Sequence, residues 1–576
     1  MQVKDVLPTK PETVFTETLT GSEILLKSLI EEQVTTIFGY PGGAIMPVYD
    51  ALYHFSEQLR HILVRHEQGA VHAAQGYARV SGKAGVVLAT SGPGATNLMT
   101  GLADAMIDST PLICITGQVA SALLGTDAFQ ETDVINVSLP LTKWNVQVTR
   151  AADIAPAVAK AFHIATTGRP GPVLIDITKD AQFELAEYAY RRCTSVSTYR
   201  PVPELDHDAV AAAAALLNTA DRPYILAGQG VLLASATQEL IALAEAGGIP
   251  VASTLLGLSG FPTDHPLYVG YLGMHGNYSP NINTNQADVI LAVGMRFDDR
   301  VTGDIRTYAP KAKIIHIDID KAEINKILKA AVAINADARE ALAALNGRVV
   351  ARDRSAWLQS FKDLDRLEER IRFNDCHPDQ GQPRMGEVIR HLAELTGGEA
   401  VIVTDVGQHQ MVTSRYFPYR NPRSNITSGG LGTMGFALPA AIGAAYAASG
   451  KPVVAVIGDG GFQMTLQELG TIMQYGVPVK ILILNNNFLG MVRQWQQLFF
   501  EKRYAFTEMS NPDFTKLAEA YSIPARKVAA RTDLARAVGE MLEAVGPYLL
   551  EVVVEKEENV FPMVPAGAGV ADIRLS

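Results

Sequence analysis

The sequence predicts an α/β protein made of three doubly wound domains with mainly parallel sheets. Short runs of β-branched residues alternate with segments of helical periodicity, which is typical of parallel strands covered by helices. This alternation breaks down over Ala181–Leu205 and again over Arg352–Pro383, where charge and proline accumulate. The 576 residues are enough for about three to five domains of ordinary size, and the two breaks favour three.

The first domain is expected over residues 20–185. Its opening segment, Thr20-Gly-Ser-Glu23, has the spacing of a capping box, so a helix should begin there. Residues 1–19 mix acids, lysines and prolines without an apolar stretch and are expected to be a flexible leader. The expected strands are Thr35–Phe38, Ile62–Val64, Gly85–Ala89, Leu112–Thr116 and Val173–Ile177, and the expected helices are Met46–Phe55, Glu67–Arg79 and Thr96–Met106.

The second domain (206–350) and the third domain (384–560) show the same alternation of strand and helix patterns. A charged linker is expected between them at 351–383, and a tail at 561–576. The second domain should contain strands at Tyr224–Ala227, Pro250–Thr254, Val289–Val293 and Ile314–Ile317, and a helix near Ala338–Leu345. The third should contain strands at Val401–Thr404, Val453–Ile457, Ile481–Leu484 and Leu549–Val554, and helices at Met411–Tyr416, Pro439–Ala448, Thr465–Tyr475 and Leu534–Val545.

The composition excludes several classes of protein. Hydrophobic residues make up 48% of the chain and charged residues 19%, which rules out disordered, collagen-like and coiled-coil proteins. The net charge of −11 provides no basic surface for general binding of nucleic acids or anionic membranes. No apolar run reaches the ~18 residues of a membrane span. The three widely spaced cysteines form neither a disulfide framework nor a zinc cluster, which indicates a reducing compartment, the cytoplasm.

Two motifs at strand ends in the third domain predict a site for a metal and a diphosphate. Gly458-Asp459-Gly460 follows one expected strand and Asn485-Asn486 follows a neighbouring one, so the acid and the amide should meet at the carboxyl edge of the sheet. Both side chains offer oxygen ligands for Mg²⁺, and the flanking glycines let a diphosphate approach the backbone. Either half alone is more often a simple turn or loop, but the pairing with the correct intervening elements favours the site.

This pair of motifs resembles the signature of enzymes that use thiamin diphosphate (ThDP). Further motifs resemble one family, the catalytic subunits of acetohydroxyacid synthases, also called acetolactate synthases. They are Phe38-Gly39-Tyr40-Pro41-Gly42-Gly43, Arg65-His66-Glu67-Gln68-Gly69-Ala70, Ser91-Gly92-Pro93-Gly94-Ala95-Thr96-Asn97, Asp127-Ala128-Phe129-Gln130-Glu131, Gly168-Arg169-Pro170-Gly171-Pro172-Val173, Gly273-Met274-His275-Gly276, Arg296-Phe297-Asp298-Asp299-Arg300 and Gly429-Gly430-Leu431-Gly432-Thr433-Met434-Gly435. The resemblance spans about Thr20 to Gly569. It implies a ThDP-, Mg²⁺- and FAD-dependent enzyme that decarboxylates pyruvate and condenses the hydroxyethyl enamine with a second pyruvate or with 2-oxobutyrate, the first common step of branched-chain amino-acid biosynthesis.

The same resemblance assigns Glu67 to catalysis. It implies that this carboxylate hydrogen-bonds the aminopyrimidine ring of ThDP and so promotes loss of the thiazolium proton. Without the resemblance, a Glu beside Arg65 and His66 is usually part of a surface ion pair. The implied Mg²⁺ ligands are Asp459, Asn486 and the backbone carbonyl of Phe488.

Met434 resembles the apolar wedge that folds ThDP into a V shape. Its neighbouring glycines also fit a dinucleotide fingerprint, but no strand directly precedes them and no helix opens before about Pro439. His409 is implied as a contact on the diphosphate side, although a helix cap explains it equally well. The implied ThDP contacts are Tyr40, Pro41, Gly42, Glu67, Gln408, His409, Gly432, Met434, Gly458, Asp459, Gly460, Gly461, Asn486, Leu489, Gly490 and Met491.

The middle domain is where families of this architecture diverge. Gly228-Gln229-Gly230 allows close approach to a phosphate but lacks the third glycine of the fingerprint, with Leu233 in its place. The Arg296–Arg300 motif resembles that of biosynthetic synthases, in which bound FAD takes no net part in the reaction; a spacer without a cofactor is the alternative. The implied FAD contacts are Arg169, Gly228, Gly230, Thr254, Leu255, Met274, His275, Gly294, Arg296, Asp298, Asp318 and Asp337.

Substrate contacts are implied in all three domains. Trp495 resembles the residue that favours 2-oxobutyrate over pyruvate through an apolar contact worth ~1 kcal/mol per methylene, although packing is the usual role of Trp. Arg300 is the candidate for the substrate carboxylate, because a guanidinium binds a carboxylate through two parallel hydrogen bonds. Roles in the pocket are also implied for Gly43, Phe129, Gln130 and Lys179.

The resemblance has consequences for assembly. Glu67 and Asp459 lie in different domains, and in the family they come from different chains, which implies a homodimer or homotetramer with shared active sites. A small regulatory subunit is implied as well. Two other classes stay open: an oxidoreductase such as a pyruvate oxidase, and a cofactor-carrying protein without carboligase activity. Glyoxylate carboligases are a nearer family, but they carry an apolar residue where this chain has Glu67.

Overall fold

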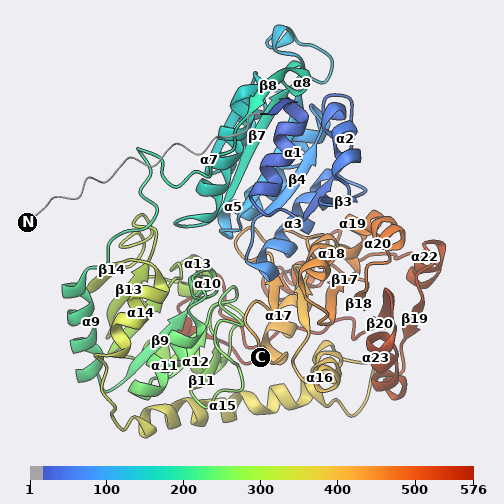
Figure 1. Ribbon diagram of the computed structural model, residues 1–576. Helices are drawn as coiled ribbons and strands as arrows, with labels where there is room; N and C mark the ends of the chain where they lie inside the picture. The colour runs from blue at the N-terminus through green and yellow to red at the C-terminus, as the bar shows by residue number, and fades with distance from the viewer. Residues whose placement is uncertain (1–16) are drawn as a thin grey trace, which may run out of the picture.

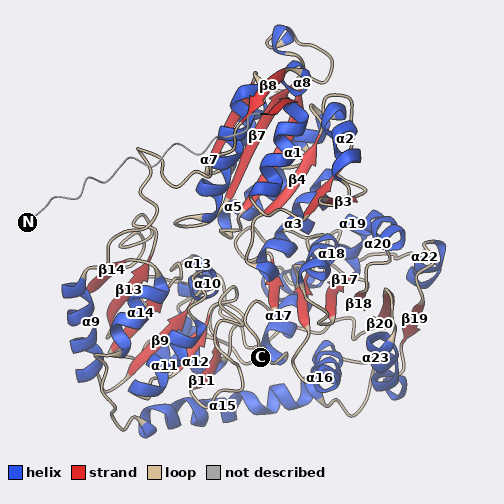
Figure 2. Cartoon of the chain, in the orientation of Figure 1, coloured by secondary structure: helices blue, strands red, loops and turns tan. Residues whose placement is uncertain are grey.

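The computed structural model describes residues 17–576. Three six-stranded sheets form three domains, and all neighbouring strands within each of these sheets are parallel. Figure 1 shows the first domain at the top in blue and teal, the second at lower left in green, and the third at lower right in orange and red. Helices flank the strands of each sheet (Figure 2). The predicted fold class is confirmed.

The first domain has the strand order β3-β2-β4-β5-β7-β6. Its strands are β2 (Thr36–Gly39), β3 (Arg60–Leu63), β4 (Gly85–Ala89), β5 (Leu112–Gln118), β6 (Trp144–Val148) and β7 (Pro172–Thr178). Its helices are α1 (Gly21–Glu31), α2 (Met46–Leu52), α3 (Glu67–Ser81), α4 (Pro93–Thr96), α5 (Met99–Ile107), α6 (Val134–Ser138), α7 (Ile154–Thr166) and α8 (Lys179–Phe183). The expected capping box is present at the start of α1, with Thr20 and Glu23 each bonding the other's backbone N–H.

The second domain has the order β11-β10-β9-β12-β13-β14. These strands are β9 (Pro223–Ala227), β10 (Val251–Ser253), β11 (Tyr268–Tyr271), β12 (Val289–Val293), β13 (Lys313–Asp318) and β14 (Val332–Asn335). The helices are α9 (His207–Thr219), α10 (Gln229–Leu233), α11 (Thr237–Gly247), α12 (Tyr278–Thr284), α13 (Asp299–Thr302) and α14 (Ala338–Asn346).

The third domain has the order β16-β15-β17-β18-β20-β19. These strands are β15 (Val401–Thr404), β16 (Asn425–Thr427), β17 (Val453–Gly458), β18 (Val479–Asn485), β19 (Ala525–Val528) and β20 (Tyr548–Val553). The helices are α16 (Met385–Thr396), α17 (Gln408–Tyr416), α18 (Ala437–Ala447), α19 (Asp459–Thr465), α20 (Leu469–Tyr475), α21 (Gly490–Phe499), α22 (Phe514–Ala520) and α23 (Leu534–Glu543).

The expected leader and the expected tail both contain residues that form β-sheet contacts. Residues Glu17–Thr20 form strand β1, which pairs antiparallel with β8 (Leu185–Tyr188). The rest of the expected leader lies outside the described residues. The tail folds back on itself and on the second domain through bridges between Met563 and Arg574 and between Gly303 and Gly569.

The expected linker at 351–383 is largely one helix, α15 (Ser355–Cys376), which runs along the lower edge in Figure 1. It is ordered because Trp357 and Phe361 on one face join the apolar core of the second domain. The many charges on its other faces hid this pattern in the sequence. In the part of the chain from residue 17 onward, none of the helices is both long enough and apolar enough to cross a membrane.

The first and third domains share one apolar core, in which α3 packs directly on α18. The helices meet through small residues: a Cβ on Gly76 would lie 1.9 Å from the Ala440 carbonyl oxygen, and one on Gly443 would lie 1.7 Å from that of Ala73. Such distances leave no room for a side chain, so glycine is required at both positions.

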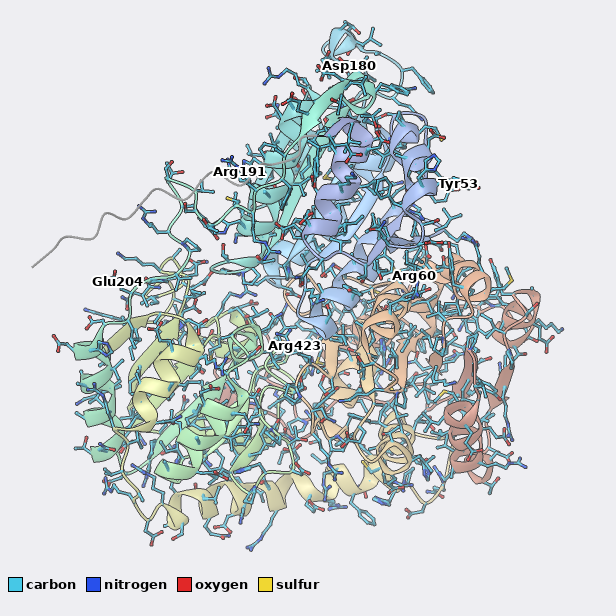
Figure 3. All side chains as sticks on the ribbon, viewed as in Figure 1. Tyr53, Arg60, Asp180, Arg191, Glu204 and Arg423 are labelled. Carbon is cyan, nitrogen blue, oxygen red and sulfur yellow. The ribbon has the colours of Figure 1, made fainter. Side chains whose placement is uncertain are left out.

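All three domains meet at Arg423, which is labelled at their junction in Figure 3. Its guanidinium donates to the backbone oxygen of Arg79 in the first domain, at 3.3 Å, and to that of Leu232 in the second, at 2.8 Å. One third-domain side chain therefore bonds to both of the other domains.

We expect Gly443→Ala to destabilise the pair formed by the first and third domains. The added methyl group clashes with a backbone oxygen, and overpacking of this kind costs typically about 1–3 kcal/mol, which lowers the melting temperature by several degrees. Gly539→Ala is the matched control, because Gly539 lies in helix α23 with no atom near its Cβ position, and it should raise the melting temperature slightly. Differential scanning calorimetry measures both; equal melting temperatures for the two variants would contradict the packing argument.

Candidate functional site

The carboxyl edge of the third sheet brings the two motifs together. Strands β17 and β18 are parallel neighbours with Gly458 paired to Leu484, so Asp459 and Asn486 follow at the same edge. Both are buried, with exposed fractions of 1% and 4%. They line one small cavity of about 50 Å³, which we call the diphosphate cavity.

The diphosphate cavity contains nearly all of the ThDP contacts expected in the third domain. Its lining includes Gln408, His409, Met434, Gly458, Asp459, Gly460, Gly461, Asn486, Phe488, Leu489, Gly490 and Met491. Gly432 borders the adjacent larger cavity instead. Sequence reasoning missed Met385, Val406, Gly407, Leu484 and Val492, which are neighbours of the motifs along the chain or apolar side chains with no chemical signal.

A network of amides orients Asp459. The Asn511 side-chain nitrogen donates to Asp459 Oδ2 at 2.7 Å and to the side-chain oxygens of Asn485 and Asn487, each at 3.0 Å. Burial raises the pKa of Asp459 to about 6, and the Asn511 hydrogen bond opposes that rise. Asn511 lies far from both motifs in the sequence, and only the fold identifies it as a member of the site.

The donor set fits a hard cation and a phosphate. In residues 17–576 there is no cluster of three or more His, Cys, Asp or Glu side chains of the kind that holds a metal. The oxygens of the cavity lining are the Asp459 carboxylate, the Asn486 and Gln408 amides and backbone carbonyls. Mg²⁺ bound together with a phosphate typically uses such a limited protein set. A Cβ on Gly458 would lie 2.9 Å from the His409 ring, and one on Gly460 would lie 2.8 Å from Leu489. The glycines therefore keep the cavity open.

His409 presents an unused polar atom in this cavity. Its Nε2 is buried without a hydrogen-bond partner among the described residues. Burial lowers the pKa of His409 to about 4, so the ring is neutral at pH 7. A neutral imidazole can donate one N–H to an anionic oxygen, which is the chemistry a diphosphate requires.

A second cavity, of about 1070 Å³, lies beside the first and is called here the large cavity. Cofactor sites commonly have volumes of ~300–1,000 Å³. Eleven of the twelve residues expected to contact FAD line it, namely Arg169, Gly230, Thr254, Leu255, Met274, His275, Gly294, Arg296, Asp298, Asp318 and Asp337. Gly228 does not, because it packs against Gly294 and Met295. The two cavities share Met434 and Met491.

Polar groups of the large cavity are held by local contacts. Arg169 forms ion pairs with Asp320 at 3.2 Å and with Glu323 at 2.9 Å. Burial raises the pKa of Asp318 to about 6 and lowers the pKa of His275 to about 3. The Nδ1 atom of His275 is buried and, within residues 17–576, has no hydrogen-bond partner. A buried His275 nitrogen that lacks a partner within residues 17–576, in a residue lining a cavity of this size, indicates that the cavity binds a polar ligand.

Two acids of this cavity also serve local structure. Asp298 accepts the N–H groups of Arg300 and Val301 at the start of α13, and Asp337 caps α14. Trp495 and Arg300, expected from the sequence to contact substrate, line the same cavity. The Trp495 ring lies 5.3 Å from that of Phe499.

Comparison with known proteins gives the same division of the chain. Residues 19–137, 210–345 and 405–552 match the family models described as thiamine pyrophosphate enzyme N-terminal TPP binding domain, central domain and C-terminal TPP binding domain. The acetolactate synthase large subunit of Corynebacterium glutamicum is 46% identical over 573 residues, covering 97% of this chain and 91% of that protein. The probable acetolactate synthase large subunit of Methanocaldococcus jannaschii is 45% identical, covering 96% and 95%. A chloroplastic acetolactate synthase 2 of Nicotiana tabacum is 45% identical, covering 96% and 85%.

The chain belongs to the acetolactate synthase family. Its N-terminal and C-terminal domains are thiamine pyrophosphate (ThDP) binding domains, so it is a ThDP-dependent carboligase. The resemblance stated from the sequence motifs is confirmed.

The first-domain residues expected at the acetolactate synthase site form a separate group. Glu67 begins α3, is 9% exposed and accepts a hydrogen bond from Asn97 at 2.9 Å. Thr90 lies beside both Gly42 and Gly94, and Gly94 lies next to the Glu67 carboxylate. Across the described chain, neither the diphosphate cavity nor the large cavity is lined by any of the expected first-domain ThDP or catalytic residues, Tyr40, Pro41, Gly42, Glu67, Gln130 and Lys179.

We expect Asn511→Ala to weaken ThDP binding about 10- to 100-fold, because partners that orient a ligating group typically contribute that much. Isothermal titration with ThDP in the presence of Mg²⁺ measures the change. Asn421→Ala is the control: this third-domain amide bonds Glu399 at the surface, and its loss should leave the affinity unchanged. Equal affinities for the Asn511 variant and the unmodified chain would show that the amide network does not support the cavity.

Proposed function

We propose that the chain catalyses the acetolactate synthase reaction: it decarboxylates pyruvate and joins the two-carbon product to a second pyruvate or to 2-oxobutyrate. The observation that carries the proposal is the diphosphate cavity, which is lined by Asp459, Asn486 and Met434, in a chain about 45% identical to acetolactate synthases over nearly its full length. ThDP, when bound, would supply a nucleophilic carbon for the keto group and an electron sink for the decarboxylation.

In this proposal the third domain anchors the diphosphate end of the cofactor. The Asp459 carboxylate, the Asn486 amide oxygen and the Phe488 carbonyl would hold Mg²⁺, in keeping with its preference for oxygen ligands. The His409 imidazole and the free N–H groups at the start of α17 would donate to phosphate oxygens. Met434 and Met491 make part of the cavity lining apolar, and exclusion of water would favour a step in which a charged carboxylate is lost as neutral CO₂.

Glu67 is proposed to act in the site of a second copy of the chain. The group formed by Glu67, Tyr40, Pro41 and Gly42 is separate from its own chain's cavities, and both surfaces carry exposed apolar side chains. Phe129, which precedes Gln130 in the chain, is 88% exposed; Leu431, which lines the large cavity, is 45% exposed, and Met464, next to Gly435, is 55% exposed. Apolar surface of this kind is typical of an interface. A homodimer or homotetramer would bring the Glu67 carboxylate to the pyrimidine ring, where it would hold the proton at the ring nitrogen.

Substrate selection is assigned to the part of the large cavity that lies next to Met491. Trp495 and Arg300 line the large cavity next to Met491, and Gln130 and Lys179 would be supplied by the partner's first domain. In this arrangement Arg300 would bind the carboxylate of the second 2-oxoacid, and the indole of Trp495 would contact its alkyl end.

The large cavity is proposed to bind FAD. Its volume of about 1070 Å³ and its lining, which includes Asp318 and Asp337 of the second domain and Met434 of the third, suit a dinucleotide, and His275 Nδ1, unpaired among the described residues, offers it a polar partner. Met434 and Met491 line both cavities, so the flavin would lie next to the ThDP site and stabilise the junction between domains without entering the reaction.

The shared-site proposal predicts complementation between two inactive variants. Glu67→Gln should lower kcat about 10²- to 10³-fold with ThDP affinity retained, and Asp459→Ala should abolish Mg²⁺-dependent ThDP binding. When the two are unfolded, mixed equally and refolded, random dimers should recover roughly a quarter of normal activity, because half are mixed and one of two sites in each is intact.

The assay supplies pyruvate with 2-oxobutyrate and quantifies 2-acetolactate and 2-aceto-2-hydroxybutyrate. Each variant refolded alone is the control. An Asp459→Ala and Glu67→Gln mixture that stays inactive while unmodified chain refolds with full activity would refute the shared site. Absence of both products from the unmodified enzyme would refute the function itself.

We expect the protein to bind FAD tightly and pyruvate not to reduce the bound flavin. Titration of flavin-free protein with FAD should raise the melting temperature in a concentration-dependent manner, whereas riboflavin, which lacks the nucleotide end, should raise it little. Anaerobic pyruvate should leave the visible flavin spectrum unchanged. Bleaching of the flavin under these conditions would favour an oxidoreductase of the pyruvate oxidase type.

A further inference from the structure

The segment 428–436 between β16 and α18, called here the wedge loop, carries Met434 and borders both cavities. It contains four glycines, of which Gly432 and Gly435 have φ values of 70° and 86°. Glycine-rich backbone of this kind has many accessible conformations and must be held from outside to keep one of them. The question is which side chains hold it.

Asp108, at the end of α5 in the first domain, binds the start of the wedge loop. Its carboxylate accepts the backbone N–H groups of Gly429 at 2.9 Å and Gly430 at 2.7 Å. It also pairs with Arg79 at 2.9 Å, and Arg79 donates in turn to the Thr427 carbonyl just before the loop. Two loop amides and one guanidinium thus converge on a carboxylate that is 0% exposed.

Asp104, one turn earlier on α5, binds the middle of the wedge loop. Its Oδ1 accepts the hydroxyl of Thr433 at 2.8 Å and the hydroxyl of Ser428. Ser428 also accepts the Thr433 N–H at 2.8 Å, so the loop is closed on itself around this carboxylate. Thr433 is the residue immediately before Met434.

Two buried carboxylates beside one guanidinium are costly unless other donors satisfy them. Four of the five groups that donate to these carboxylates belong to the wedge loop, namely the Ser428 and Thr433 hydroxyls and the Gly429 and Gly430 N–H groups. Asp104 Oδ2 is buried without a partner among the described residues, so a change in the loop conformation would leave the pair with almost no donors. On the far side of Met434, Asp405 accepts the N–H groups of Gly435 at 3.0 Å and Ala437 at 2.9 Å. Met434 therefore lies between two carboxylate anchors, one of which comes from a different domain.

We propose that Asp104 and Asp108 are positioning residues that hold the wedge loop from the first domain and thereby set the place of the Met434 side chain against the rings of ThDP. The inference rests on the proposed function for the role of Met434. Neither acid lines the diphosphate cavity or the large cavity, so their effect passes through Gly429, Gly430 and Thr433.

The first test needs no cofactor. In the ThDP-free protein, Asp108→Asn should accelerate amide hydrogen exchange at Gly429 and Gly430 about 10-fold or more, since hydrogen bonds to a charged group are typically worth that much. Asp176→Asn is the matched control: Asp176 is equally buried in the first domain and accepts hydrogen bonds from Thr116, Gln118 and Gln147. It should leave exchange in the wedge loop unchanged. Unchanged exchange in Asp108→Asn, or equal acceleration in the control, would overturn the proposal.

The second test is a double-mutant cycle read by ThDP binding. Asp104→Asn and the near-isosteric Thr433→Val should each weaken ThDP affinity about 5- to 10-fold, and the double variant should be no weaker than the worse single variant, because both remove the same contact. At saturating ThDP, the near-ultraviolet circular dichroism of the bound cofactor should also decrease, since it depends on how the two rings are held. Additive losses, or an unchanged dichroism and affinity in both variants, would overturn the positioning role.

The outcomes separate this inference from the proposed function. If the unmodified chain binds ThDP and forms product while the variants bind and react equally well, only the positioning role fails. If the unmodified chain forms no product, the proposed function fails and the role of Met434 fails with it, even where the exchange data show that the loop is held.

Discussion

The close backbone contact between α3 and α18 is the constraint on which the rest of the structure depends. At Gly76 and Gly443 the two helices approach until even a methyl group would overlap a carbonyl oxygen. This approach merges the first and third domains into one core. It also brings the end of α5 within hydrogen-bonding distance of the wedge loop, where contacts of 2.7–2.9 Å tolerate little displacement. A wider helix pair would break those bonds before it exposed any apolar surface.

Helix α3 links two parts of the chemistry. Glu67 is its first residue and Arg79 lies near its end, a separation of roughly 18 Å at 1.5 Å per residue. Arg79 supports the Asp108 anchor of its own chain's wedge loop, whereas Glu67 is the acid proposed for the neighbouring copy. One rigid helix would therefore fix the distance between the acid of one site and the wedge of the other. Packing against α18, which is buried along most of its length, gives the helix that rigidity.

The sequence predicted the elements whose signals are local. Every expected strand is present, and Asp459 and Asn486 meet because parallel neighbours end at the same edge. What failed depended on distant contacts. Helix α15 looked like a charged linker because only a narrow face is buried. The roles of Asp104 and Asp108 were not predicted, since nothing near them in sequence shows that a loop some 320 residues later supplies their donors. Asn511 was missed for the same reason.

The site retains polar groups that a structure selected for stability alone would avoid. His409 Nε2 and His275 Nδ1 are buried without partners among residues 17–576, and each such atom typically costs about 1–3 kcal/mol. Burial raises the pKa values of Asp459 and Asp318 to about 6, above the ordinary value of an aspartate, so the cost of their charge grows as the pH rises from about 4 through 6. These groups border the two cavities. Ligands that bring a cation to Asp459, hydrogen-bond donors to Asp318 and anionic or polar atoms to the imidazoles would offset the cost only in the folded state. The chain without cofactors therefore has a lower free energy of unfolding than its apolar cores alone would give it. The groups that lower it lie where the cofactors are proposed to bind.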